Sequence, residues 1–118
     1  MKRIVLTALA SSALTAVTIF QLFGAPPAAK IALENAHVKV SEITYPAGAV
    51  RPRSIRPANE VIVFLDGCRY ERTDPKTGAK TIRQRKSGEV IWHNKGEDAP
   101  VLRSLTSNSY REIVVELK

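Results

Sequence analysis

The stretch GAVRPRSIRPANEVIVFLDG, residues 48–67, decides the fold of this chain. It begins and ends in glycine, and its single carboxylate before the final turn, Glu60, stands directly before an apolar run. Every residue of that run, 61–65, is apolar, whereas a strand with one wet face would alternate polar and apolar side chains. We therefore expect a strand that is covered on both faces. The second cover would be another sheet or a second subunit, which favours a homodimer.

Strand-like segments separated by turn residues surround this stretch and continue to the C-terminus. We expect eight strands, over residues 37–45, 49–56, 60–66, 68–73, 79–85, 89–93, 101–106 and 110–117. Short strands at this spacing are typical of an all-β sandwich or barrel. Between two of them, residues 74–78 carry a proline and a glycine at the positions that close a hairpin.

The N-terminal residues have a different character. A basic head, Lys2 and Arg3, precedes the uncharged and mostly apolar residues 4–23, and the next charge is Lys30. This pattern is typical of a secretory signal peptide, which we place at residues 1–25, or of a membrane anchor that is retained. A buried helix of the domain is the remaining alternative. Residues 26–34 are predicted to be a linker because Pro26 and Pro27 block a helix, and residues 35–118 form the domain.

Charge and cysteine content narrow the function classes. The chain carries a formal charge of +7 from 18 basic and 11 acidic side chains; without Lys2 and Arg3 the charge is +5. In an exported protein, periplasmic or secreted, such a surface suits small anions or anionic lipids and glycans rather than nucleic acid. A solvated basic face without a partner remains an alternative. Cys68 is the single cysteine, so no intrachain disulfide forms, and we expect it to be buried.

The quoted stretch resembles the first sequence motif of the cupin superfamily. That motif reads Gly, five residues, His-x-His, three or four residues, Glu, six residues, Gly. Laid on this chain, it places its glycines on Gly48 and Gly67, its glutamate on Glu60, and its two histidine positions on Ser54 and Arg56. The resemblance implies a single jelly-roll β-barrel, also called a double-stranded β-helix, over residues 35–118.

The second cupin motif reads Gly, five residues, Pro-x-Gly, two residues, His, three residues, Asn. Its two glycines fall on Gly88 and Gly96, while its proline, histidine and asparagine positions hold Asn94, Ala99 and Arg103. The glycine frame of both motifs is therefore kept while the histidines are lost. Glycines persist where turns need conformations that a side chain would strain.

In the family, the three histidines and the glutamate bind a transition metal. This chain keeps Glu60 alone, because Ser54 is a weak ligand, Arg56 is a permanent cation and Ala99 offers no donor. The resemblance therefore implies no metal and no cofactor here. The two histidines of the chain, His37 and His93, lie outside the motif positions, and we expect His93 at the surface or rim.

The altered motif positions suggest a binding site. Family resemblance places Ser54, Arg56 and Glu60 toward the barrel interior, where Ser54 and Arg56 would hold the carboxylate or phosphate of a small anion. We expect Trp92 and Arg103 at the wall of this pocket. An ion pair between Arg56 and Glu60 that fills the barrel is the alternative.

Two further pairs of arginines stand at alternate positions, Arg51 with Arg53 and Arg83 with Arg85. Each pair is expected to be a solvated strand face, or a basic barrel mouth that attracts anions.

The resulting prediction is an exported, non-catalytic, metal-free cupin-domain protein that binds a small anion or a protein partner. Membrane contact would occur only through residues 4–23. The alternative is an enzyme that uses Glu60, either a sugar isomerase or epimerase or a metal-dependent oxygenase.

Overall fold

The computed structural model describes residues 24–118. The predicted signal peptide or anchor, residues 1–25, lies outside this range except for Gly24 and Ala25. Residues 24–118 form strands and turns only, and within them no helix is long and apolar enough to cross a membrane.

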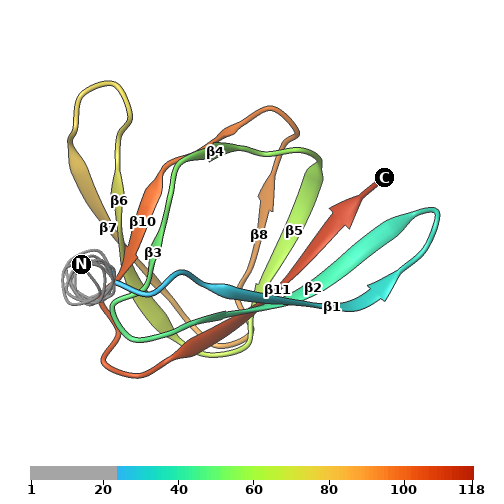
Figure 1. Ribbon diagram of the computed structural model, residues 1–118, viewed down its shortest axis with the longest axis horizontal. Coiled ribbons are helices and arrows are strands. Elements are labelled where there is room, and N and C mark those ends of the chain that lie inside the picture. Colours follow the sequence, from blue (N-terminus) through green and yellow to red (C-terminus); the bar gives the residue numbers. More distant parts are fainter. Residues whose placement is uncertain (1–23) are drawn as a thin grey trace, which may run out of the picture.

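Antiparallel strands build the whole domain. The part of the chain that the structure describes contains β1 (Ala28–Glu34), β2 (Val38–Tyr45), β3 (Val50–Arg51), β4 (Ser54–Ile55), β5 (Asn59–Phe64), β6 (Cys68–Thr73), β7 (Lys80–Arg85), β8 (Val90–His93), β9 (Asp98–Ala99), β10 (Val101–Ser104) and β11 (Tyr110–Leu117). One sheet has the order β1-β2-β11-β5-β8 and a second has the order β3-β10-β6-β7. The two sheets face each other, and the β4–β9 pair links them across one end (Figure 1).

Some strands begin or end at other residues than expected, because of prolines and because an additional strand pairs at the edge of one sheet. The predicted linker, 26–34, instead contains β1, which pairs with β2 and forms the edge of the five-stranded sheet. The two prolines precede this strand, where no ladder hydrogen bond is needed from them. The strand expected over 49–56 is split into β3 and β4 at Pro52, and Pro100 separates β9 from β10. Proline has no N–H to donate to a ladder.

The apolar core lies between the two sheets. Tyr45 of β2 and Tyr110 of β11 stack face to face, with ring centroids 4.7 Å apart, and Phe64 of β5 packs against Tyr70 of β6. The buried core residues are Tyr45, Ala49, Ile62, Phe64, Cys68, Tyr70, Leu102, Tyr110 and Val114. The burial of Cys68 confirms the expectation, and burial raises the pKa of its thiol to about 12.

Two motif glycines close tight turns. Gly48 adopts a φ of 71° in a turn where the Ala49 N–H donates to the Pro46 carbonyl at 2.9 Å. Gly88 adopts a φ of 86°, and its N–H donates to the Phe64 carbonyl at 2.7 Å. Side chains strain this left-handed region, so glycine is required at both turns.

The apolar run 61–65 is covered on its inner face. Ile62 and Phe64 point into the core, while Val61 and Val63 are half-buried on the outer face of the sheet. Among the coloured segments of Figure 1, no strand packs on that outer face. The expected second cover is therefore not supplied by residues 24–118, and the homodimer stays a prediction.

The stacked tyrosines predict the largest loss of stability on truncation. We expect Tyr110→Ala to lower the free energy of unfolding by about 3–5 kcal/mol, because it removes a buried ring and leaves a cavity beside Tyr45. Tyr110→Phe retains the stack and should cost less than about 1.5 kcal/mol. Urea unfolding measures both changes, and equal losses in the two variants would contradict the assigned role of the stack.

Candidate functional site

Arg56 lies just after β4, and its backbone is fixed by the turn that follows β8. Its N–H donates to the Glu97 carbonyl, and the Gly96 N–H donates to the Arg56 carbonyl, both at 2.9 Å. Gly96 has a φ of 85°, which lets the turn approach in this way. These two hydrogen bonds hold the Arg56 side chain toward the barrel interior, where the residue is only 8% exposed.

A buried ion pair joins Arg56 to Glu60. Glu60 points inward because the side chains of β5 alternate, and its carboxylate accepts a hydrogen bond from Arg56 Nη1. The predicted alternative, an Arg56–Glu60 pair inside the barrel, is therefore present. It does not satisfy the whole guanidinium, because Arg56 Nε is buried without a partner among residues 24–118.

Two further guanidinium groups enter the barrel from the opposite sheet. Arg51 of β3 donates from Nη2 to the Pro100 carbonyl at 2.8 Å, while its buried Nε has no partner in the described part of the chain. The guanidinium of Arg72 of β6 makes no hydrogen bond or ion pair with any residue of that part. Burial lowers the pKa of Arg72, and the positive charges of Arg56 and Arg51 act in the same direction. Positive charge at this wall is therefore incompletely compensated.

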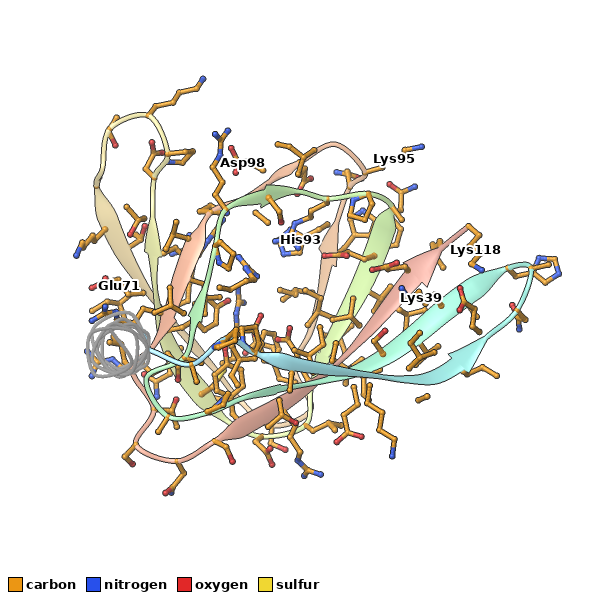
Figure 2. All side chains as sticks on the ribbon, in the orientation of Figure 1. Lys39, Glu71, His93, Lys95, Asp98 and Lys118 are labelled. Atoms are coloured by element: carbon orange, nitrogen blue, oxygen red, sulfur yellow. The ribbon has the colours of Figure 1, made fainter. Side chains whose placement is uncertain are left out.

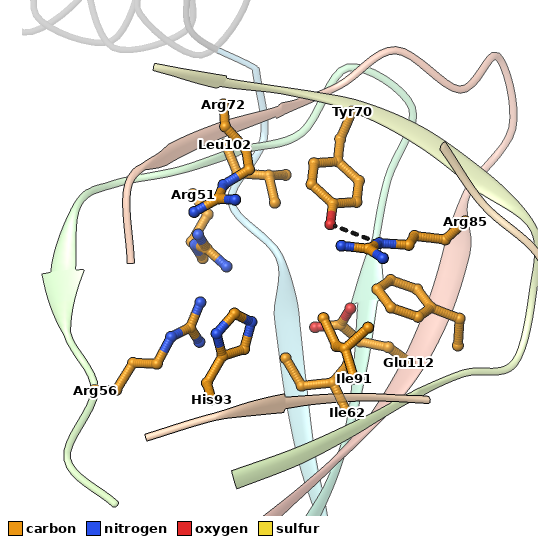
Figure 3. Close-up of a pocket in the computed structure, with 11 residues that line it drawn as sticks. Arg51, Arg56, Ile62, Tyr70, Arg72, Arg85, Ile91, His93, Leu102 and Glu112 are labelled. Carbon is orange, nitrogen blue, oxygen red and sulfur yellow. Dashed lines mark hydrogen bonds between the residues drawn. The ribbon is translucent and has the colours of Figure 1, made fainter. Parts of the chain in front are cut away.

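Arg85 of β7 also points inward but is already satisfied. Its Nε donates to the Tyr70 hydroxyl at 3.2 Å (Figure 3), and its Nη1 donates to Glu89 at 2.6 Å. Its guanidinium also lies 5.7 Å from the centre of the Phe64 ring. We therefore regard Arg85 as part of the wall rather than as a free ligand-binding cation.

His93 faces the interior, contrary to the expected surface or rim position. It is the cross-strand partner of Glu60, so both side chains lie on the inner face of the sheet. Figures 2 and 3 show the His93 ring pointing into the barrel. Burial lowers the pKa of His93 below its ordinary value, and the positive charge of Arg56 acts in the same direction. The neutral form of the ring therefore predominates at pH 7. Since a carboxylate only accepts, the neutral ring donates from Nδ1 to Glu97 at 3.1 Å.

Two adjacent cavities lie between the sheets. The smaller, of about 30 Å³, is walled by Arg72, Arg85 and His93, and the larger, of about 170 Å³, by Ser54, Glu60 and other residues. Arg51, Arg56, Ile62 and Glu112 line both. In Figure 3 the guanidinium groups of Arg51, Arg56 and Arg72 and the ring of His93 point into one common space. The barrel is thus hollow on either side of the Arg51–Arg56 wall.

Glu112 of β11 is a buried carboxyl between these cavities. It is 5% exposed, and within residues 24–118 its carboxyl has no hydrogen-bond or ion-pair partner. Burial raises its pKa to about 7, and the charges of Arg51 and Arg56 oppose this rise only in part. A carboxyl with this pKa exchanges its proton near neutral pH.

The structure separates the predicted site residues into two groups. Ser54, Arg56 and Glu60 all line the larger cavity, as their motif positions indicate, although Ser54 is exposed at its edge. Trp92 is 49% exposed and Arg103 is exposed, and neither lines a cavity. Both sit on outward positions of their strands, since the inward positions of β8 and β10 belong to other residues.

Only one member of each arginine pair lines a cavity. Arg51 lines the cavities, whereas Arg53, beyond the Pro52 break, turns outward and pairs with Asp98 at 2.7 Å. Arg85 faces inward, but Arg83 is exposed. The expectation that each pair forms one solvated face is therefore wrong for Arg51 and Arg85.

Sequence reasoning missed Arg72, His93 and Glu112 as site residues. Arg72 could have been found, because it continues the alternation of the buried Cys68 and Tyr70 along β6. Glu112 could not, since the alternation of β11 identifies two faces without saying which one is inside. His93 required the register between β5 and β8, which no local pattern contains.

The donor set does not fit the transition metal of the resembled motifs. At these positions, Arg56 places a permanent cation beside Glu60, and Ala99 supplies no donor. Across residues 24–118, no group of three or more His, Cys, Asp or Glu side chains gathers as a metal site requires.

Comparison with known proteins locates the fold. No protein-family model matches the chain, and no curated protein matches it in sequence. A cupin domain from Bordetella pertussis Tohama I superposes with a TM-score of 0.72 at 16% identity, over 80% of this chain and 95% of that one. An RmlC-like cupin family protein with a double-stranded β-helix fold from Methanocaldococcus jannaschii gives 0.61 at 14% identity, over 77% and 79%.

A protein with an assigned reaction has the same fold. The polyketide cyclase RemF from Streptomyces resistomycificus superposes with a TM-score of 0.61 at 16% identity, over 80% of this chain and 69% of that one. Likeness at such identities reports the fold and leaves the reaction open. The described part of this chain is therefore a small all-β domain with the cupin fold, a jelly-roll β-barrel or double-stranded β-helix.

Proposed function

We propose that this protein binds a small anion inside its barrel without a metal. The observation that carries the proposal is the pair of buried guanidinium groups, Arg51 and Arg56, each with an Nε that has no partner among residues 24–118. Both groups line both cavities, and Arg72 adds a third cation to the smaller one. Unpaired buried N–H groups are costly, so a bound anion would satisfy donors that the protein alone leaves open.

Export is the second element of the proposal. The basic head and the apolar residues 4–23 support it, and the anion would then be met outside the cytoplasm. If residues 4–23 are retained, they would tether the domain to the membrane. The net positive charge of the chain would favour the approach of anions in either case.

Removing one of the two guanidinium groups with an unpaired Nε should weaken anion binding. We expect malonate and inorganic phosphate to raise the melting temperature of residues 24–118, and Arg51→Gln to weaken their binding about tenfold or more, because charged hydrogen bonds are lost. Arg72→Gln should weaken binding by a smaller factor. Isothermal titration calorimetry at low salt measures the affinities.

Arg103→Gln is the matched control, because this exposed arginine lies on the outer face of β10. It should leave the affinities unchanged. Equal effects of Arg51→Gln and Arg103→Gln, or no response of the wild-type protein to either anion, would refute the proposed site.

A second candidate function is acid–base catalysis in the same barrel, and Glu112 favours it over the expected Glu60. Glu60 is committed to Arg56 by the buried ion pair. Glu112 is free of such a partner in residues 24–118, lines both cavities and has its pKa raised to about 7, close to the optimum for proton transfer. An isomerase or epimerase acting on a small acid would need such a group beside a bound carboxylate.

The raised pKa of Glu112 predicts a pH-dependent stability. The folded state binds the Glu112 proton more tightly than the unfolded state, so the free energy of unfolding falls as pH rises from about 4.5 to 7. The loss is on the order of 3 kcal/mol. Glu112→Gln should remove this loss and be more stable than the wild type at pH 8. Urea unfolding at several pH values gives the difference between the two proteins.

Glu42→Gln, on the outer face of β2, is the control and should retain the wild-type pH profile. The difference between the wild type and Glu112→Gln isolates Glu112 from other groups, including His93, whose lowered pKa acts with the opposite sign below about pH 6.5. A constant difference between pH 5 and 8 would show that Glu112 titrates normally.

A homodimer is the third element of the proposal, and the outer face of the five-stranded sheet supports it. One row of direct cross-strand partners is apolar on every strand: Leu33, Val40, Val115, Val61 and Trp92. Val38 and Leu117 lie beside this row, as do Ile113, Val63 and Val90. A second copy placed by a two-fold axis would bring the same apolar row to both sides.

Placing a charge in this apolar row should dissociate the dimer. We expect Trp92→Lys to convert the protein from a dimer to a monomer in light scattering coupled to size exclusion, because a lysine would be buried against apolar partners. Ile82→Lys, at an exposed apolar residue of β7 in the other sheet, is the control and should remain dimeric. A monomeric wild-type protein at about 100 μM would refute the dimer.

A further inference from the structure

The larger cavity carries uncompensated charges of both signs. On one side it is lined by Arg51 and Arg56, whose Nε atoms are unpaired within residues 24–118. On the other side it is lined by Glu112 and Glu116 of β11. Neither of these carboxyl groups has a hydrogen-bond or ion-pair partner in the described part of the chain. A simple anion would satisfy the first wall and leave the second one open.

The pairing of β11 with its neighbouring strands explains why its glutamates point into this cavity. Glu116 is the cross-strand partner of Glu60 on β5 and of Lys39 on β2, with which it forms no ion pair, and Glu112 lies on the same face of β11 two inward positions earlier. Glu60 is neutralised by Arg56, so Glu112 and Glu116 supply the free negative charge. The negative charge of Glu60 adds to the burial that raises the pKa of Glu112, and a cation at this wall would act in the opposite direction.

The remaining lining suits a short organic molecule. Ile43, Ile62 and Val114 provide apolar surface between the charged walls, and the buried ring of Tyr45 also borders the cavity. With a volume of about 170 Å³, the cavity suits a molecule of a few heavy atoms rather than an oligomer.

We propose that the anion bound in this barrel is the acidic end of a small zwitterion, whose ammonium group lies against the β11 wall that carries Glu112 and Glu116. Its carboxylate would accept hydrogen bonds from Arg51 and Arg56, with the Ser54 hydroxyl at the cavity edge. The ammonium would donate to Glu116, and its positive charge would favour the ionised form of Glu112 farther along the same wall. This inference rests on the proposed anion site and adds the chemical class of the ligand.

Matched pairs of probes that differ only in the amino group test the inference. Calorimetry compares β-alanine, γ-aminobutyrate and 5-aminopentanoate with propionate, butyrate and pentanoate on the same protein. We expect at least one amino acid to bind about tenfold or more tightly than its matched monocarboxylate, because the ammonium gains charged hydrogen bonds. Binding of the amino acid should also release a proton near pH 7.

Variants assign the two ends of the ligand. Glu116→Gln should reduce the preference for the amino acid towards unity and leave the monocarboxylate affinity unchanged, whereas Arg51→Gln should weaken both. Glu42→Gln, whose side chain lies on the outer face of the sheet, is the matched control and should change neither. Glu116 is partly exposed and unpaired within residues 24–118, so its substitution should preserve folding.

The outcomes separate this inference from the proposed anion site. If monocarboxylates or malonate bind but no amino acid binds more tightly than its partner, the zwitterion is wrong and the anion site stands. If Glu116→Gln weakens both members of a pair equally, the ammonium does not lie at β11 and the inference is again wrong. If none of the probes and neither malonate nor phosphate binds, both proposals fail.

Discussion

A buried guanidinium group requires an anion nearby, and the interior of this barrel contains more guanidinium than it neutralises. Arg56 obtains a carboxylate from Glu60, but Arg51 has only one backbone carbonyl and Arg72 has no partner in the described part of the chain. Removing a charge from water costs several kcal/mol unless it is paired. The arrangement therefore weakens the unliganded domain and reserves binding energy for a molecule that supplies negative charge.

The Arg56–Glu60 pair also shapes the space around it. It stands at the positions of two metal ligands in the resembled motif, and it replaces an ion by a hydrogen-bonded bridge between the β4 end and β5. Fixing the Arg56 backbone through Gly96 and Glu97 keeps this bridge in place. One set of glycine-supported turns can thus hold either imidazole groups around a metal or a guanidinium beside a carboxylate.

The sequence predicted the barrel because glycine positions and strand alternation are local properties. Gly48 and Gly88 lie in turns with positive φ, and the apolar residues Ile62 and Phe64 point into the core, as the quoted stretch indicates. The inward placement of Arg56 and Glu60 followed from the same frame. The edge strand β1 did not, since alanine and lysine are weak strand formers and only the free edge of β2 made pairing favourable.

The remaining site residues depend on which strands meet. Trp92 and His93 are adjacent, and one of them must face inward, but the choice is made by the pairing of His93 with Glu60. Likewise, Glu112 and Ile113 compete for the interior of β11, and composition favours the isoleucine. The structure places Glu112 inside because its cross-strand partner on β5 is the core residue Phe64. Buried charge of this kind contradicts local preference, which is typical of functional positions.

The irregular register of β1 affects whether the sheet of one molecule can be extended by a strand of another. An edge strand presents unpaired backbone groups that another chain could extend, and all residues of β1 are exposed. The shift in register between Ile31 and Leu33 interrupts the flat row of donors and acceptors at the middle of this edge. Growth of the sheet from chain to chain into a fibre is thereby disfavoured, while the flat apolar face beside it remains available for closed assembly.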